Sequence, residues 1–194
     1  MRKLIGAGAI AVTLAVLAGS SAQAGPPPRQ ARVTGTAEFV LTFSPDDDIR
    51  RFTFDVRANP YSEPKPGAEN GLPTDATGTV KIYHWVAKDG IAVTAEASAD
   101  CLITNPGGAI VTAIVTRADP LVADWVGRRL GFSVQDGGSR GPDRAGYSWS
   151  FSGDQDENGT WGAARIGTCL APAPFAPVTR GDFTVRHVDL RPEK

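Results

Sequence analysis

Alternation of apolar and polar residues is the main pattern along this chain. It is clearest over residues 91–103, where Ile91, Val93 and the next odd-numbered residues are apolar while Thr94 and Glu96 are polar. A period of two is typical of a β-strand with one buried face. Similar alternation, or a short apolar run, predicts strands at residues 33–43, 52–57, 78–87, 109–115, 130–134, 147–151, 163–169 and 183–188.

Turn and loop signals separate these segments, and only one short helical element is expected. Asn105-Pro106-Gly107-Gly108 is a typical turn sequence. Asp119 and Pro120 have the residue types of an N-cap and a first helical position, which predicts a helical turn over residues 121–126. Residues 59–75 contain four prolines and no period, which predicts a long loop that is either functional or mobile.

The predicted fold class is therefore all-β. Eight or nine short strands with strong turns favour a single antiparallel β-sandwich. A partly closed β-barrel is the alternative, because up-and-down strands of this length also close on themselves.

The N-terminal residues have the pattern of a secretory signal peptide. Arg2 and Lys3 precede an uncharged apolar stretch over residues 4–17, and Ala22-Gln23-Ala24 fits a cleavage site. About 14 apolar residues are fewer than the ~20 that span a bilayer. We therefore expect a signal peptide at 1–24, a Pro-rich leader at 25–31 and one domain at 32–194, with the mature protein secreted, extracellular and without a membrane anchor.

Composition narrows the classes of partner. The 194 residues include 20 Lys and Arg against 21 Asp and Glu. Such a balance lacks the electrostatic footprint of a nucleic-acid-binding protein. A domain of this size buries enough surface to fold alone, so we expect a monomer.

The two cysteines, Cys101 and Cys169, are expected to form one disulfide. A pair of cysteines in an oxidising compartment most simply forms a bond, and too few Cys and His residues exist for a zinc site. Cys101 continues the odd-numbered apolar set of its strand. It is therefore predicted to point into the core, where the disulfide would join the two layers of the sandwich.

Two histidines could serve hydrolytic chemistry. His84 and His187 are each in phase with an apolar strand face, so they could meet across the sheets as a base or as metal ligands. The alternative, which we favour, is two separate hydrogen-bonded histidines. Nucleophile-elbow, phosphate-loop and dinucleotide motifs are missing from the sequence, so no catalytic residue is assigned and a non-catalytic protein is expected.

Calcium is the one metal that the sequence suggests, and no other cofactor is expected. Asp154, Asp156 and Asn158 alternate before a glycine, as in the first half of an EF-hand loop. The position that needs a bidentate glutamate is Arg165, which excludes an EF-hand but leaves a looser calcium site open. The acidic run Asp46-Asp47-Asp48 could add ligands if the two loops lie close together.

Aromatic platforms that stack on sugar rings are a further candidate. The four tryptophans are Trp85, Trp125, Trp149 and Trp161. Trp149 is in phase with apolar neighbours, which favours the core, whereas Trp161 follows the acidic loop and is the first platform candidate to test. Trp85 and Tyr83 face away from His84, so they lie on the opposite face of their strand.

Three segments carry a family resemblance. Residues 44–50, 117–138 and 167–177, which include Ser44-Pro45-Asp46-Asp47-Asp48-Ile49-Arg50 and Gly167-Thr168-Cys169, resemble secreted actinobacterial proteins labelled "repetin". The resemblance covers nearly all of the mature chain. It lies in the general residue composition and in the order of the segments, and it includes no catalytic motif. It implies a secreted protein and assigns no functional residue.

Three functions follow as hypotheses. The first is a secreted, non-catalytic protein that binds a partner or serves as an extracellular structural component. The second is a calcium- or carbohydrate-binding module. The third is a secreted hydrolase that uses His84 or His187.

Overall fold

The structure is a computed structural model, and it describes residues 29–44, 46–65, 67–148, 157–158 and 169–189. The predicted signal peptide and most of the leader lie outside these residues, as do residues 149–151 of the strand expected at 147–151 and residues 163–168 of the strand expected at 163–169. Within the described part of the chain, none of the helices has the length and apolar character needed to cross a membrane.

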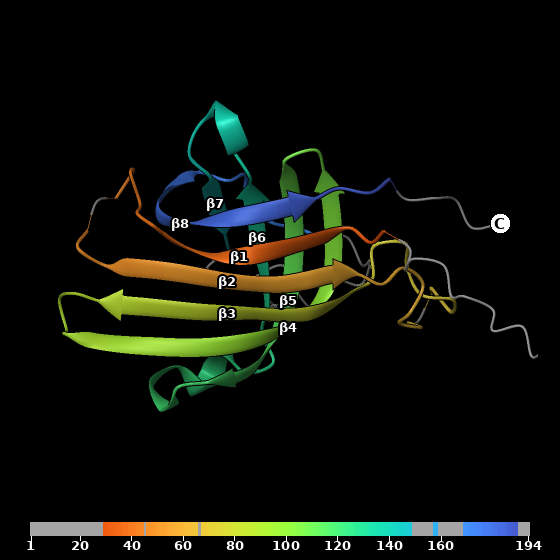
Figure 1. The fold of residues 1–194 in the computed structure, drawn as a ribbon. Coiled ribbons are helices and arrows are strands. Elements are labelled where there is room, and N and C mark those ends of the chain that lie inside the picture. The colour runs from red at the N-terminus through yellow and green to blue at the C-terminus, as the bar shows by residue number, and fades with distance from the viewer. Residues whose placement is uncertain (1–28, 45, 66, 149–156, 159–168, 190–194) are drawn as a thin grey trace, which may run out of the picture.

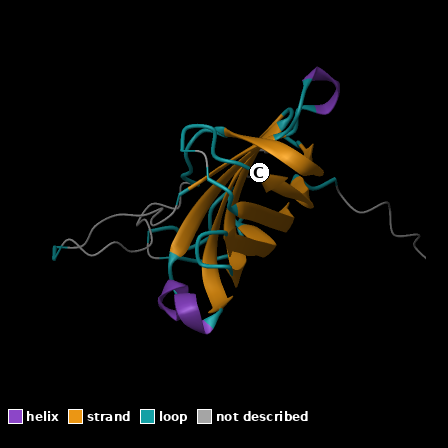
Figure 2. Ribbon diagram, turned by 90° about the vertical axis from the view of Figure 1, so that its left-hand side faces the viewer, coloured by secondary structure: helices purple, strands orange, loops and turns teal. Residues whose placement is uncertain are grey.

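Eight antiparallel strands form a closed barrel in which each strand pairs with its neighbour in sequence and the first pairs with the last. The strands are β1 (Arg32–Phe39), β2 (Ile49–Ala58), β3 (Ala76–Val86), β4 (Ile91–Asn105), β5 (Gly108–Ala118), β6 (Arg129–Gln135), β7 (Arg144–Tyr147) and β8 (Ala176–Arg186). Two short 3-10 helices, η1 (Pro120–Trp125) and η2 (Gly138–Arg140), lie outside the wall of strands (Figure 2).

The all-β antiparallel prediction is confirmed, but the sandwich is not found. A sandwich has two sheets with separate edges, whereas here β1 forms backbone hydrogen-bonding ladders with both β2 and β8. The barrel that the sequence offered as an alternative is nearer to the structure. Strand pairing between the two ends of the chain is a long-range property that local periodicity does not report.

The strands of the barrel run in two main directions. In Figure 1, β1, β2 and β3 run across the view while β5 runs nearly at right angles behind them. β4 connects the two directions, because it pairs with β3 and also with β5. Its pairing with β5 shifts register between Glu96 and Ala97 and again between Ala99 and Cys101. Strands that turn a corner at a β-bulge are the usual means of joining two crossed layers.

The bulge also corrects the prediction for Cys101. Before it, the odd-numbered residues of β4 face the core; after it, Leu102 faces the core opposite Val111, so Cys101 and its partner Thr112 lie on the outer face. The disulfide to Cys169 does form, with the two Cα atoms 5.5 Å apart. It fastens the segment before β8 to the outside of β4, instead of crossing the interior between layers.

The fastened segment, residues 169–175, is here called the strap. It runs over β6 and β7, where the Ser133 hydroxyl donates a hydrogen bond to the carbonyl of Pro172 and Arg144 donates to the carbonyls of Pro174 and Phe175. Gly146 permits this approach, because a Cβ there would lie 2.4 Å from the carbonyl oxygen of Ala173.

Aromatic rings fill the inside of the barrel. Their centroids lie 4.8 to 6.2 Å apart, in tilted or edge-to-face pairs. The rings come from β1, β2, β6, β7 and β8: Phe39, Phe52, Phe54, Phe132, Tyr147 and Phe183. A hollow near His84 and Tyr147 measures only about 20 Å³, little more than one water molecule requires.

Candidate functional site

The outer face of β2, β3 and β4 carries the most distinctive surface chemistry of the described residues. Strand periodicity places Val80, Ile82 and His84 of β3 toward the interior, and Tyr83 and Trp85 on the outer face, where both rings are partly exposed. This confirms the predicted separation of Tyr83 and Trp85 from His84. We call the two rings the aromatic platform.

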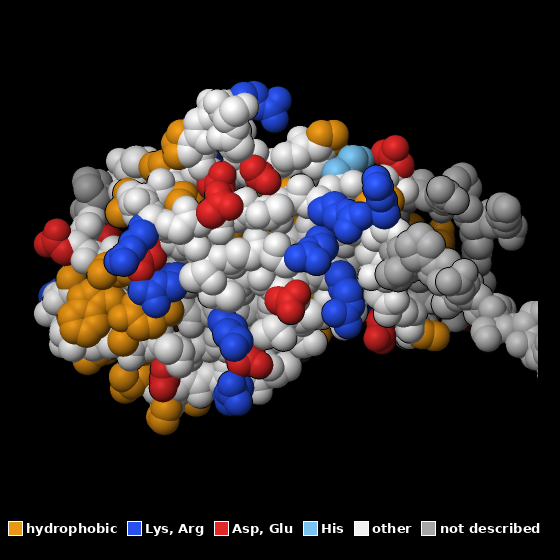
Figure 3. All heavy atoms as spheres, in the orientation of Figure 1, with side chains coloured by type: hydrophobic (Ala, Val, Ile, Leu, Met, Phe, Trp, Pro, Cys, Tyr) orange, Lys and Arg blue, Asp and Glu red, His pale blue; other side chains and the backbone are white. Residues whose placement is uncertain are grey.

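Apolar neighbours extend the platform around Trp85. In the strand register, Trp85 lies opposite Ile49 of β2 on one side and Ala92 of β4 on the other. Ile49 is 41% exposed. Figure 3 shows hydrophobic side chains gathered at the left-hand end of this face, over the ends of these strands.

Tyr83 is held in place by charged neighbours. The Arg51 guanidinium lies 4.8 Å from the centre of the Tyr83 ring, a distance typical of a cation–π contact. The same guanidinium forms an ion pair with Glu38 of β1. Because Arg51 is directly opposite Tyr83 in the register, the two contacts limit the rotation of the ring.

A groove of about 440 Å³ lies beside the platform, between β3, β4 and the start of η1. Its polar lining comprises Arg51, Thr53, Lys81, Thr94, Glu96, Arg117 and Asp119, with Tyr83 at one side. Glu96 accepts a hydrogen bond from Arg117 at 2.8 Å, and Lys81 lies opposite Glu96 in the register. The groove therefore offers donors and acceptors next to a flat aromatic surface.

Asp119 anchors η1 to the edge of this groove. It does not cap the helix with its side chain as the sequence suggested. Its carboxylate instead accepts hydrogen bonds from the backbone amide and the hydroxyl of Thr94 on β4. Pro120 does occupy the first turn, as predicted. The helix thus forms a wall of the groove.

A buried ion-pair cluster lies behind the platform, at the same end of the barrel. Arg50 is 5% exposed and donates two hydrogen bonds to Asp46, at 2.8 and 2.7 Å. Its side chain also contacts Asp48 at 3.2 Å, and Asp48 lies 2.7 Å from His84 Nε2. The cluster joins the β1–β2 loop to β2 and β3.

The same contacts shift the pKa values of both carboxyl groups. The hydrogen bond from Arg50 holds the pKa of Asp46 below its ordinary value. Burial opposes ionisation of Asp48, but the backbone amide of Ala87 and the His84 side chain outweigh it, so the pKa of Asp48 is also lowered. The acidic run at 46–48 thus has two carboxylates that already have cationic partners.

The two histidines do not meet. His84 lies near the end of β3, whereas His187 follows β8 at the opposite end of the front layer. There His187 contacts the Thr104 hydroxyl through Nδ1 and Asp189 through Nε2, each at 3.0 Å. The favoured prediction of two separate, hydrogen-bonded histidines is confirmed, and a joint catalytic or metal site is not what the structure forms.

The calcium candidates are mostly beyond the described residues. Asp154 and Asp156 lie outside them, and Asn158 is exposed. In the part of the chain that the structure describes, no group of three or more His, Cys, Asp or Glu side chains is placed to hold a metal ion. The calcium site therefore stays a prediction.

Two of the four tryptophan candidates, Trp149 and Trp161, also lie outside the described residues. Trp125 in η1 is partly buried against the barrel core. Of the described tryptophans, Trp85 alone projects from the outer face of a strand. Sequence periodicity placed it there, but the charged groove beside it depends on the register of three strands.

A larger hollow of about 600 Å³ lies along the strap. Its described lining has no aromatic side chain and consists mainly of small residues and prolines. Two arginines line it: Arg144 is already bonded to the carbonyls of Pro174 and Phe175, whereas Arg140 is exposed. The hollow has less to offer a ligand than the groove beside Tyr83.

Comparison with known proteins gives no match: no family model, no curated protein and no solved structure is significantly similar to this chain. The resemblance to repetin-labelled proteins stays a prediction. Function has to be inferred from the surface itself.

Proposed function

We propose that the protein is an extracellular, non-catalytic binding protein that recognises carbohydrate on the outer face of β2, β3 and β4. The observation that carries the proposal is the pair of outward-facing rings, Tyr83 and Trp85, beside a groove lined by charged and hydroxyl side chains. The apolar face of a sugar ring stacks on such a platform, while its hydroxyls bond to the polar rim.

The arrangement of the groove supports this assignment. Arg51 is restrained by Glu38 and by the Tyr83 ring, and Asp119 is restrained by Thr94. Side chains that are already ordered lose less conformational entropy when a ligand binds. The closed and filled interior directs ligands to this outer surface.

An extracellular location is supported by two observations. The disulfide between Cys101 and Cys169 is of the kind that persists in oxidising compartments. Residues 1–24 have the charge, apolar stretch and small residues of a secretory signal.

Retention on insoluble polysaccharides tests the proposal. The mature protein is expected to be retained on at least one matrix from a panel of cell-wall and plant polysaccharides, and Trp85→Ala should weaken its affinity at least tenfold. Tyr83→Ala should act in the same direction, because it removes both the ring and the surface that holds Arg51.

Phe43→Ala is the matched control. Phe43 is a large aromatic residue and is 71% exposed, but its position in the β1–β2 loop is separate from the groove. It should bind as the unaltered protein does. Equal binding by the Trp85→Ala variant, with an unchanged melting temperature, would show that the platform is not the site. Titration with calcium chloride alone tests separately the calcium site predicted at Asp154, Asp156 and Asn158.

A further inference from the structure

Three arginines lie side by side at the far end of the same outer face. In the strand register, Arg32 of β1 is directly opposite Arg57 of β2 on one side and Arg186 of β8 on the other. Residues opposite each other in antiparallel strands project to the same side, with Cβ atoms about 5 Å apart. All three side chains are exposed. We call them the arginine row.

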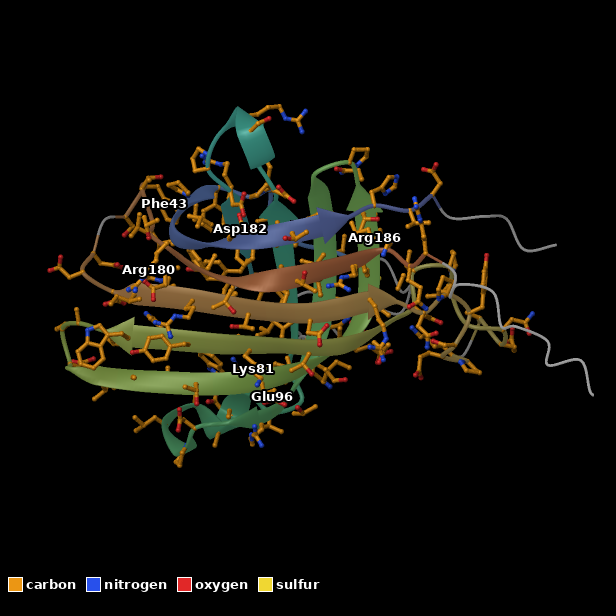
Figure 4. All side chains as sticks on the ribbon, in the orientation of Figure 1. Phe43, Lys81, Glu96, Arg180, Asp182 and Arg186 are labelled. Carbon is orange, nitrogen blue, oxygen red and sulfur yellow. A yellow bond between two sulfur atoms is a disulfide. The ribbon has the colours of Figure 1, made fainter. Side chains whose placement is uncertain are left out.

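The figures place the row at the opposite end from the platform. Figure 4 labels Arg186 at the right-hand end of β8. Figure 3 shows Lys and Arg side chains gathered over the right-hand ends of β8, β1 and β2. The hydrophobic side chains near the platform lie at the left-hand end of the same view.

The three arginines have no ion-pair partner within 4 Å among the described residues, a property that Arg29, Arg140, Arg144 and Arg180 share. Only the row places such arginines directly opposite one another in neighbouring strands. By contrast, carboxylates pair with Arg50, Arg51, Arg117, Arg128 and Arg129. Asp55, the acidic residue on the same face of β2 as Arg57, forms no ion pair with the row. Like charges placed directly opposite each other destabilise a sheet, so an anionic ligand would relieve a repulsion that folding leaves in place.

A polar track joins the row to the platform. Arg57 lies opposite Thr77 of β3, and Trp85 is eight residues further along that strand, which corresponds to about 26 Å at ~3.3 Å per residue. Between them the outer face presents hydroxyl groups, such as those of Thr36 and Thr53, which are 2.9 Å apart. Lys81 lies part of the way along and is also without an ion pair among the described residues.

We propose that the carbohydrate is an acidic polysaccharide that lies along this face, with one segment stacked on the platform and anionic groups bound by Lys81 and the arginine row. Guanidinium groups bind carboxylate, sulfate and phosphate with paired hydrogen bonds. This inference rests on the proposed function, and it adds the charge of the ligand and the direction in which its chain runs.

Matched polymers test the charge requirement. Binding of polygalacturonate, dextran sulfate and neutral dextran is measured by titration calorimetry at two salt concentrations. Arg32→Gln, the centre of the row, should weaken binding of at least one of the two acidic polymers about tenfold and reduce its salt dependence. If the unaltered protein binds neutral dextran, the Arg32→Gln variant should bind it with the same affinity. The two acidic polymers separate carboxylate from sulfate recognition.

Arg140→Gln is the control, since Arg140 is an exposed arginine on η2, away from this face. It should leave all affinities unchanged. If Arg32→Gln and the triple variant R32Q/R57Q/R186Q bind acidic polymers as the unaltered protein does, the row is not part of the site and the inference fails.

The two proposals fail in distinguishable ways. If the arginine variants bind with unchanged affinity but Trp85→Ala abolishes binding, the proposal of carbohydrate recognition stands. Only the inference that the ligand is acidic then fails. If a DNA duplex or vesicles of anionic phospholipid bind more tightly than either polysaccharide and lose that binding in R32Q/R57Q/R186Q, the row serves a different macromolecule. That result would overturn the present inference.

Discussion

At the scale of single residues, Asp75 shows how one carboxylate can organise a long loop. The side chain is fully buried. Its carboxylate accepts hydrogen bonds from the backbone amides of Ser62, Glu63 and Leu72. It also forms an ion pair with the Lys65 ammonium at 2.9 Å. The prolines at 59–75 indicated an aperiodic loop. They gave no sign that a single acidic residue holds it together, because those contacts form only when the loop folds back.

Asp75→Asn should destabilise the protein. An asparagine has only one acceptor oxygen, which can face either the three backbone amides or the Lys65 ammonium, so its NH2 group is left against donors on the other side. We expect the free energy of unfolding in urea to fall by about 3 kcal/mol. Asp55→Asn, at an exposed position on β2, should change it by less than about 0.5 kcal/mol. Equal effects of the two substitutions would contradict the role assigned to Asp75.

The same residue makes stability depend on pH. Burial acts to raise the pKa of Asp75, but the Leu72 amide, Lys65 and the Glu63 amide outweigh it, and the folded-state pKa lies below the ordinary 3.8. The stabilisation is therefore complete above the unfolded-state pKa and is lost as the pH falls through the folded-state value. Urea midpoints measured downward from pH 5 should decline in the unaltered protein and decline less in Asp75→Asn.

At the scale of elements, β4 carries both the largest success and the clearest error of sequence interpretation. Its alternation over residues 91–99 predicted the strand and its buried face correctly. The bulge before Cys101 reverses that alternation, and the sequence around Asp100 shows no break in the pattern. Asp100 instead accepts hydrogen bonds from Thr112 and Arg129, partners that are known only once the strands are paired.

The disulfide and the strap form the other element-scale unit. The double variant C101A/C169A should lower the free energy of unfolding by about 4 kcal/mol, because the bond closes a loop with a sequence separation of 68. Guanidinium titrations of the two proteins measure this. Dithiothreitol should destabilise the unaltered protein by a similar amount and leave the double variant as it was. A double variant as stable as the parent would show that the contacts of Ser133 and Arg144 suffice to hold the strap.

The candidate site shows the same division between local and long-range information. The outward direction of Tyr83 and Trp85 follows from the period of their strand, and sequence analysis found it. The arginine row could not be found in this way, because Arg32, Arg57 and Arg186 are far apart in the chain. Only the register between β8, β1 and β2 brings them together. A net charge of −1 also conceals a local concentration of positive charge.

At the scale of the whole molecule, closure of the barrel depends on rings that reach one another across its interior. Phe54 of β2 contacts Phe132 of β6 and Phe183 of β8, with centroids 5.8 and 5.5 Å apart. Phe54→Ala should therefore cost about 4 kcal/mol in thermal or chemical unfolding. Phe43→Ala removes the same ring at an exposed position and should cost far less. Similar losses at both positions would mean that the interior is not the main source of stability.

The pairing of β1 with β8 also brings Arg32 and Arg186, the outermost residues of the strand ladder, next to each other. A short peptide could connect the chain there, and new ends could be opened at the β3–β4 turn beside Gly90, which has a positive φ of 64°. Such a circular permutant would keep every ladder of the barrel. The barrel architecture of this protein would then not depend on the order in which the strands follow one another along the chain.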